Sequence, residues 1–198
     1  MSLPNRLSRG VLSFTPYQDW RGKHAIHHGT SGNLDRRGVG DFWTMTVREY
    51  LVSPLWKRLA YRFVRNPFVV LGIAPLIMFV VEQRIPNRKS STKEQGSVWW
   101  TNLAVVVMAV VGTLTLGFWT WAILQLMVLA VAGALGIWLF YTQHQFEDVY
   151  WKGGDEWDYV DAALKGSAYL KLPRVLQWFT GNIGFHHIHH LSPRIPNR

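Results

Sequence analysis

The histidines of this chain have the spacing that most constrains its fold. All eight fall in three places. They are His24, His27 and His28, then His144, and last His186, His187, His189 and His190. On a helix, positions i, i+3 and i+4 share one face, so the HxxHH pattern at 24–28 and again at 186–190 points three imidazoles in one direction each time. Neutral imidazole is the commonest metal ligand in proteins. Because chance would have to produce this spacing twice, the sequence predicts a metal site.

The composition narrows the possible partners and the kind of metal site. The chain has 198 residues and no Cys, which excludes disulfides, Cys-ligated zinc and iron–sulfur clusters within it. Its net charge of +9 suits either nucleic acid or an anionic membrane. No nucleic-acid motif occurs, and the basic residues flank apolar runs, so we expect membrane lipids and no nucleic acid as partners.

A long uncharged stretch predicts two membrane spans. From Gln95 to Phe146 there is no Asp, Glu, Lys or Arg, which is too long for one span and suits two. Aromatic clusters, which favour membrane interfaces, mark the ends of both spans. We therefore predict a transmembrane hairpin over 99–117 and 121–141 that turns near Gly117. The turn is uncharged and the flanks are basic, so the positive-inside rule places the flanks in the cytoplasm.

A basic amphipathic helix is predicted before this hairpin. Ser53-Pro54 is a typical N-cap followed by proline at the first helical position, and Asn66-Pro67 ends the helix. Leu55, Leu59 and Phe63 recur at four-residue steps beside four Lys or Arg side chains. Such a helix typically lies on an anionic bilayer surface.

The apolar run 68–81 is predicted not to span. It is shorter than the roughly 20 residues that a spanning helix needs, and Gly72 and Pro75 interrupt it. If both HxxHH patterns bind one metal cluster, residues 28–98 make no net crossing. We therefore interpret 54–84 as an interfacial helix followed by a re-entrant segment.

Residues 144–198 are predicted to form a soluble, His-rich cap. Short helices are predicted from Glu156 to Leu164 and from Pro173 to Thr180, the second just before the last HxxHH. In the Gly-rich loop after the first HxxHH, Asp35 and Asp41 are either solvated carboxylates or partners that orient a histidine ring. The sequence supports these two interpretations equally.

The number of imidazoles indicates the chemistry. Seven exceed what one tetrahedral zinc accepts, so two metals are more economical. All-His ligation differs from the Glu-rich di-iron sites of soluble bundles. The apolar half of the chain suggests a lipid substrate. No side chain can take a proton from an unactivated methylene, so chemistry on an acyl chain needs an oxidant made from O2 at a metal.

Three motifs together resemble the membrane fatty acid desaturase family, closest to its bacterial acyl-lipid, delta-12 (omega-6)-like branch. They are His24-Ala25-Ile26-His27-His28 with 31–38, Gln143-His144-Gln145-Phe146-Glu147-Asp148, and 181–196. The resemblance implies an all-α integral membrane bundle with a cytoplasmic metal-binding cap, in a bacterial inner membrane. It implies two iron ions, O2 as co-substrate, and insertion of a C=C bond into a lipid-, CoA- or carrier-linked acyl chain. Electrons would come from ferredoxin or a cytochrome b5-type donor.

The resemblance also assigns site residues. It makes the metal ligands His24, His27, His28, His144, His186, His189 and His190. His187 falls at a variable position, and we place it with Asp35, Asp41 and Asn182 as candidates that contact ligands rather than metal. No catalytic residue beyond the ligands is expected.

One departure from the family concerns its first box, HxxxH, since no His precedes residue 24. We therefore expect 1–198 to be one desaturase domain, incomplete at both ends, and inactive as it stands. A membrane hydroxylase or ketolase with the same boxes would differ in its product, an alcohol or ketone instead of an alkene. A non-catalytic metal binder or transporter is a further alternative, although transport needs polar groups at mid-membrane depth, and the span offers few.

Overall fold

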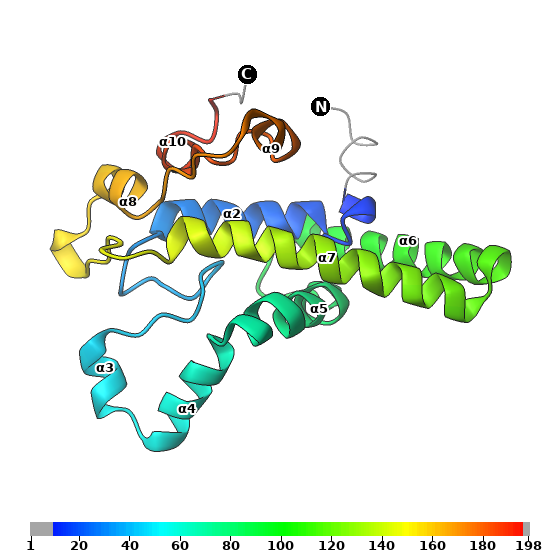
Figure 1. The fold of residues 1–198 in the computed structure, drawn as a ribbon, viewed down its shortest axis with the longest axis horizontal. Helices are drawn as coiled ribbons and strands as arrows, with labels where there is room; N and C mark the ends of the chain where they lie inside the picture. Colours follow the sequence, from blue (N-terminus) through cyan, green and yellow to red (C-terminus); the bar gives the residue numbers. More distant parts are fainter. Residues whose placement is uncertain (1–9, 196–198) are drawn as a thin grey trace. The chain divides into compact units, whose positions relative to one another are not determined.

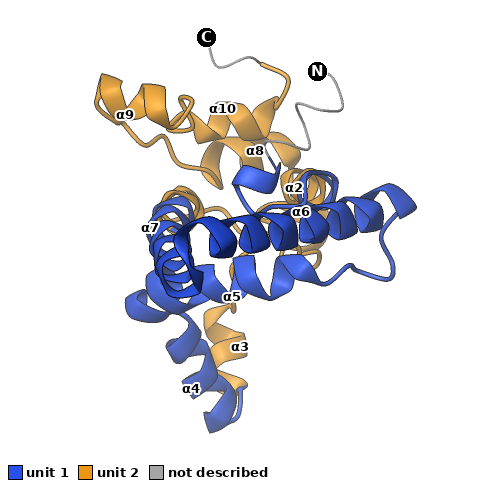
Figure 2. Ribbon diagram, turned by 90° about the vertical axis from the view of Figure 1, so that its right-hand side faces the viewer, with its two compact units in different colours: residues 1–23, 53–137 blue, residues 24–52, 138–198 orange. Residues whose placement is uncertain are grey.

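The computed structural model describes residues 10–195, and within them every regular element is helical. Only two isolated bridges, Asn33–Lys152 and Tyr169–Phe185, pair extended backbone in this part of the chain. The chain divides into two compact units, shown in different colours in Figure 2: residues 1–23 with 53–137, and residues 24–52 with 138–198. The all-α class expected from the sequence is confirmed for the described residues.

The first unit contains most of a helical hairpin, and the last residues of its second helix, 138–144, belong to the second unit. Helix α6 (Thr92–Leu116) and helix α7 (Phe118–His144) follow one another with Gly117 between them (Figure 1). Gly117 has a φ of 81°, which a residue without a Cβ adopts readily. Ser91 and Glu94 form a reciprocal capping box that starts α6. The helices are therefore longer than the predicted 99–117 and 121–141, and His144 is the last residue of α7 rather than a residue beyond it.

Two glycines allow close helix packing in this unit. A Cβ on Gly112 of α6 would lie 1.9 Å from the Trp121 ring of α7, so the indole lies directly against the α6 backbone. A Cβ on Gly133 of α7 would lie 2.7 Å from Pro75, which belongs to helix α5 (Ala74–Val80). Side chains at either position would force the helices apart.

The segment between the first HxxHH and the hairpin is broken, as its sequence predicts. Helix α4 (Leu55–Val64) begins after Pro54, one residue later than the predicted Ser53 cap. A π-helical turn η1 (Val69–Ile73) leads into α5, and a 3-10 turn η2 (Glu82–Arg84) follows. The chain bends by 60° between α4 and the helices after it. That this segment does not cross a membrane stays a prediction.

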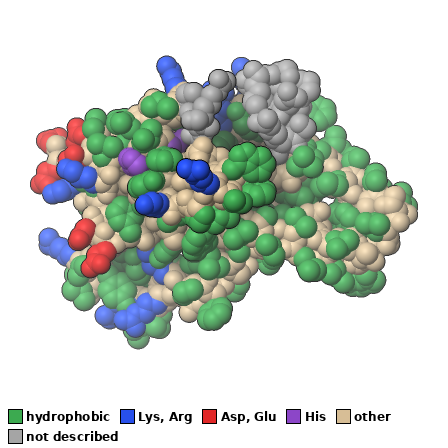
Figure 3. Space-filling model, turned by 45° about the horizontal axis from the view of Figure 1, so that its top comes forward, with side chains coloured by type: hydrophobic (Ala, Val, Ile, Leu, Met, Phe, Trp, Pro, Cys, Tyr) green, Lys and Arg blue, Asp and Glu red, His purple; other side chains and the backbone are tan. Residues whose placement is uncertain are grey.

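Length and hydropathy single out α6 and α7 as the helices able to cross a membrane among the described residues, or three spans if the bent pair counts as one. Most of their large apolar side chains are exposed, including Leu114 at 80% and Val131 at 62%. Hydrophobic side chains cover much of the face drawn in Figure 3. An apolar surface of this extent needs an apolar environment.

Among the described residues, the second unit holds five further short helices. They are α3 (Val47–Val52), η3 (Gly154–Glu156), α8 (Tyr159–Lys165), α9 (Arg174–Phe179) and α10 (His186–Leu191). Asp158 caps α8 by accepting a hydrogen bond from the backbone N–H of Asp161, so this helix begins three residues after the predicted Glu156. Helix α9 lies within the predicted 173–180. Helices α8 and α10 pack against each other.

Candidate metal centre

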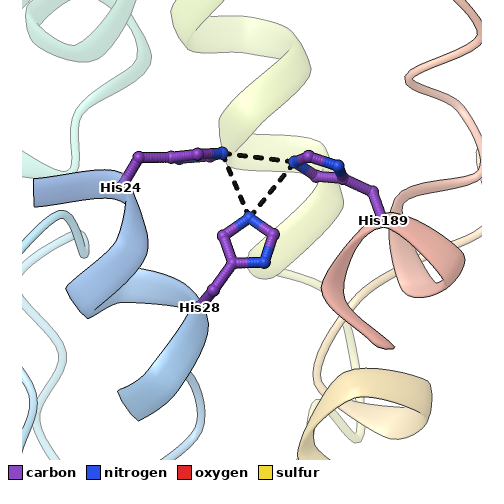
Figure 4. Close-up of side chains that lie close together, drawn as sticks. All are labelled: His24, His28 and His189. Atoms are coloured by element: carbon purple, nitrogen blue, oxygen red, sulfur yellow. Dashed lines mark hydrogen bonds between the residues drawn. The ribbon is translucent and has the colours of Figure 1, made fainter. Parts of the chain in front are cut away.

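The first three-His group joins both HxxHH patterns. His24 and His28 come from helix α2 (Tyr17–Thr30), and His189 comes from α10. The Nε2 atoms lie 3.2 Å apart between His24 and His189, 3.1 Å between His28 and His189, and 3.1 Å between His24 and His28. Figure 4 shows the three rings turned toward one point. Together these atoms form a triangle of nitrogen donors that could hold a metal ion.

The second three-His group lies deeper. His27 of α2, His144 of α7 and His190 of α10 place their ligand atoms within 4.8 Å of one another, and all three are buried. The Nε2 atoms of His27 and His144 are 3.2 Å apart. His186, at the start of α10, brings its Nε2 to 2.8 Å from that of His144. The structure thus brings together all seven histidines proposed as ligands, although three separate segments carry them.

The two groups adjoin each other. The rings of His28 and His190 stack with their centroids 4.1 Å apart and 7° between their planes. His28 belongs to the first group and His190 to the second. Two cations held by these groups would therefore be neighbours, as a two-metal site requires.

Burial keeps the imidazoles neutral. Desolvation, followed by the neighbouring histidines, lowers the pKa of His24 to about 4 and that of His28 to about 3. The pKa values of His186, His189 and His190 are lowered chiefly by the same desolvation. Near pH 7 these rings therefore carry lone pairs that a metal can accept, and binding need not first displace a proton.

Hydrogen bonding alone cannot satisfy the nitrogens of the first group. In a neutral imidazole each ring nitrogen is either an N–H donor or a lone-pair acceptor. Among three Nε2 atoms in mutual contact, at least two must both be donors or both be acceptors. Such a pair cannot form a hydrogen bond. In the second group, the buried Nε2 of His190 has no hydrogen-bond partner among the described residues. A cation accepting lone pairs would resolve both defects, so the residues present fit a metal such as iron.

Two contacts to Nδ1 atoms orient the rings of proposed ligands. The Nδ1 of His27 lies 2.8 Å from the carboxylate of Asp41, whose side chain is 7% exposed. The Nδ1 of His144 lies 3.1 Å from the carbonyl oxygen of Gly166. Both acceptors favour the tautomer with a proton on Nδ1, which leaves Nε2 free to face the cluster. Asp41, one of the two carboxylates that the sequence left open, thus contacts a proposed ligand.

The other three candidates have different contacts. The Asp35 carboxylate accepts a hydrogen bond of 2.6 Å from the backbone N–H of Gly154, which ties two loops together. Asn182 is a turn residue with a φ of 59°; its backbone N–H donates a 2.7 Å hydrogen bond to the carbonyl oxygen of Gln177, and its carbonyl oxygen accepts one of 3.1 Å from the N–H of Phe185. His187 belongs to neither three-His group, and its ring lies 5.8 Å from that of Tyr169.

Sequence reasoning missed two residues that support the cluster. The Tyr159 hydroxyl donates a 2.6 Å hydrogen bond to the carbonyl oxygen of His190 and so links α8 to α10. The Trp157 indole N–H donates a 3.0 Å bond to the carbonyl of Ser31, just past the end of α2. Both acceptors are backbone groups distant in the chain, and no local pattern marks such pairs.

Comparison with known proteins identifies the family. A sequence model described as fatty acid desaturase matches residues 3–198, nearly the whole chain. The chain belongs to the fatty acid desaturase family. The predicted resemblance is therefore confirmed, and the two three-His groups lie in a member of this family.

Individual relatives agree with this assignment. A fatty acid desaturase of Bacillus subtilis (strain 168) is 45% identical over 188 residues, which are 95% of this chain and 53% of that protein. The sn-1 oleoyl-lipid 12-desaturase of Synechocystis is 25% identical over 185 residues, 92% of this chain and 52% of the relative. An sn-1 acyl-lipid omega-3 desaturase (ferredoxin) from Synechocystis is 28% identical over 209 residues, 95% and 54% respectively. The chain spans about half the length of these curated relatives. No solved structure matches it.

Proposed function

We propose that the two three-His groups and His186, together called the histidine cage, form the metal site of a membrane enzyme that uses O2 to insert a double bond into a fatty acyl chain. The observation that carries the proposal is that each HxxHH pattern contributes to both three-His groups. A surface cluster of histidines would have no reason to interleave two distant segments in this way. Family membership then selects acyl desaturation among the reactions that two adjacent metals could support.

Two iron ions are the proposed cofactor, one at each group. When bound, iron and O2 would supply the oxidant that an unactivated C–H bond requires, which no side chain here can provide. The residues of the chain hold and orient this centre. Asp41 and the Gly166 carbonyl fix the tautomers of His27 and His144, and burial of His27, His144 and His190 keeps bulk water away from the second group.

The apolar helices suit a lipid substrate and a membrane location. Helices α6 and α7 present exposed apolar side chains from Trp99 to Leu116 and from Phe118 to Trp138, so we place them in a bilayer. In chain order, Arg88 and Lys89 precede α6, Lys93 lies in its first turn, and His144 ends α7. If α6 and α7 form a spanning hairpin, the positive-inside rule would put the histidines in the cytoplasm. Synechocystis relatives are named for acyl-lipid substrates, and one name includes ferredoxin. We therefore propose an acyl-lipid substrate and a ferredoxin-like electron donor.

The test is product analysis in a host cell. Because the chain spans about half of its relatives, the assay joins it to the part of the Bacillus subtilis desaturase that the alignment leaves uncovered. Gas chromatography with mass spectrometry of total fatty acids should show a new unsaturated acid. The same fusion carrying His28→Ala or His190→Ala is the control and should make none. A hydroxy or keto acid as the product would replace desaturation by hydroxylation or ketone formation. Equal products from the fusion and its His variants would contradict a role for the cage.

A further inference from the structure

Gln143 immediately precedes His144 and is among the most deeply buried side chains of the second unit. Only 1% of its surface is exposed. A buried carboxamide is costly unless it is hydrogen-bonded, because it gives up its bonds to water. Its contacts therefore indicate what the residue does.

The Gln143 side chain reaches the turn that precedes α10. Its Nε2 donates a 2.8 Å hydrogen bond to the carbonyl oxygen of Ile183, 40 residues further along the chain. The backbone carbonyl oxygen of Gln143 accepts a 2.9 Å hydrogen bond from the backbone N–H of Ala168, in the segment after α8. One residue near the end of α7 thus contacts both the segment that follows α8 and the turn that precedes α10.

The turn before α10 contains two residues with positive φ. Gly181 and Asn182 both adopt left-handed backbone conformations, with φ values of 61° and 59°. Helix α10 has only six residues, and a helix this short is not stable by itself. The direction in which α10 presents its histidines must therefore be set by contacts outside it.

The contact has a direct consequence for the metal centre. Ile183 lies three residues before His186, whose Nε2 is 2.8 Å from that of His144. Gln143 precedes His144 in the chain. The same pair of segments is thus joined twice, once by the carboxamide and once by the two imidazoles.

We propose that Gln143 is a positioning residue that fixes α10, and with it His186, His189 and His190, relative to His144. The inference rests on the proposed function in one respect, since it takes the histidine cage to bind metal. It adds that a hydrogen bond made by a residue that binds no metal helps to set the geometry of the histidine cluster, beside the hydrogen bond from Tyr159 to the His190 carbonyl.

Two substitutions of nearly equal size separate this bond from simple packing. Gln143→Glu keeps the shape but removes the N–H donor and directs an acceptor oxygen at the Ile183 carbonyl. Gln143→Met keeps the length and removes all polarity. Gln177, in α9 of the same unit, provides matched controls as Gln177→Glu and Gln177→Met.

The experiment measures cobalt(II) binding to the detergent-solubilised chain, because the visible spectrum of cobalt reports its coordination geometry. Both Gln143 variants should bind cobalt about 10- to 100-fold more weakly, the cost typical of lost ligand-orienting contacts. Their spectra at saturating cobalt should also differ from the wild-type spectrum, while the Gln177 controls match it. Circular dichroism establishes that each variant is folded, and if the Glu variant is not, the Met variant decides.

Different failures point to different errors. If the wild-type chain takes up no cobalt, the metal cage of the proposed function is itself wrong. If wild type binds and the Gln143 variants equal the Gln177 controls in affinity and spectrum, the positioning role is overturned. A lower melting temperature with an unchanged saturated spectrum would also overturn it, because it would show a purely structural role.

Discussion

The Nε2 atoms of His28 and His189 lie 3.1 Å apart, although 161 residues separate the two histidines in the chain. Each comes from a different HxxHH pattern, and each sits on a different helix. Their approach makes one donor set out of two sequence motifs. The consequences of this pairing can be tested one residue at a time.

Two histidines of α10, His187 and His189, should differ in their contribution to metal binding. At about 100° per residue, His187 and His189 lie about 200° apart around the axis, and only His189 lies in a three-His group. His189→Ala should lose about 10-fold or more in cobalt affinity, whereas His187→Ala should change it little. The measurement is a cobalt titration followed by absorbance. Equal losses in the two variants would contradict the assignment of ligands.

Asp41 should matter to the metal centre and Asp35 should not. Asp41→Asn weakens the acceptor that holds the Nδ1 proton of His27, so we expect about 10- to 100-fold weaker cobalt binding. Asp35→Asn alters a contact with the Gly154 backbone and should leave metal affinity near that of wild type. Isothermal titration calorimetry of both variants checks this. The opposite order would mean that the ligand-orienting carboxylate is Asp35.

Two glycines of α6 should respond in opposite ways to the same change. In Gly112→Ala the new methyl group would lie 1.9 Å from the Trp121 ring, and such overpacking costs about 1–3 kcal/mol. Gly96→Ala meets no atom within 4 Å and should stabilise the helix by about 0.5–1 kcal/mol. Melting temperatures in detergent compare the two variants. A stable Gly112→Ala protein would rule out the close packing of α6 on α7.

Membrane topology can be read by labelling, since the chain has no Cys of its own. Single cysteines at Asn66 and Glu82 flank the broken segment, and one at Phe118 marks the hairpin turn. If the segment is re-entrant, an impermeant maleimide should reach positions 66 and 82 from the same side and position 118 from the other. Labelling of 66 and 82 from opposite sides would make the segment a true span.

Much of the fold could be predicted because its signals are local. The absence of charge from Gln95 to Phe146 predicts a long apolar hairpin, and α6 and α7 are that hairpin. Asn66-Pro67 predicts the end of α4, which ends at Val64. Helix α3 was missed because its six residues give no clear periodicity.

The pairing of the histidines could not be predicted from their spacing alone. The interpretation that each HxxHH directs three rings one way is only approximate. At 100° per residue, His28 lies about 40° from His24 but about 100° from His27. His27 therefore joins His144 and His190, while His24 and His28 join His189. Which partner each ring meets depends on tertiary packing, as does the choice of Asp41 over Asp35.

The most direct test of the cage is the number of metal ions it binds. Purified chain, loaded with cobalt and freed of excess metal, is assayed by mass spectrometry of the metal against protein concentration. We predict about two ions per wild-type chain and about one in either His28→Ala or His190→Ala, since each variant disables a different three-His group. His187→Ala should retain about two. A wild-type chain with no bound metal, or the same stoichiometry in all four proteins, would contradict the account.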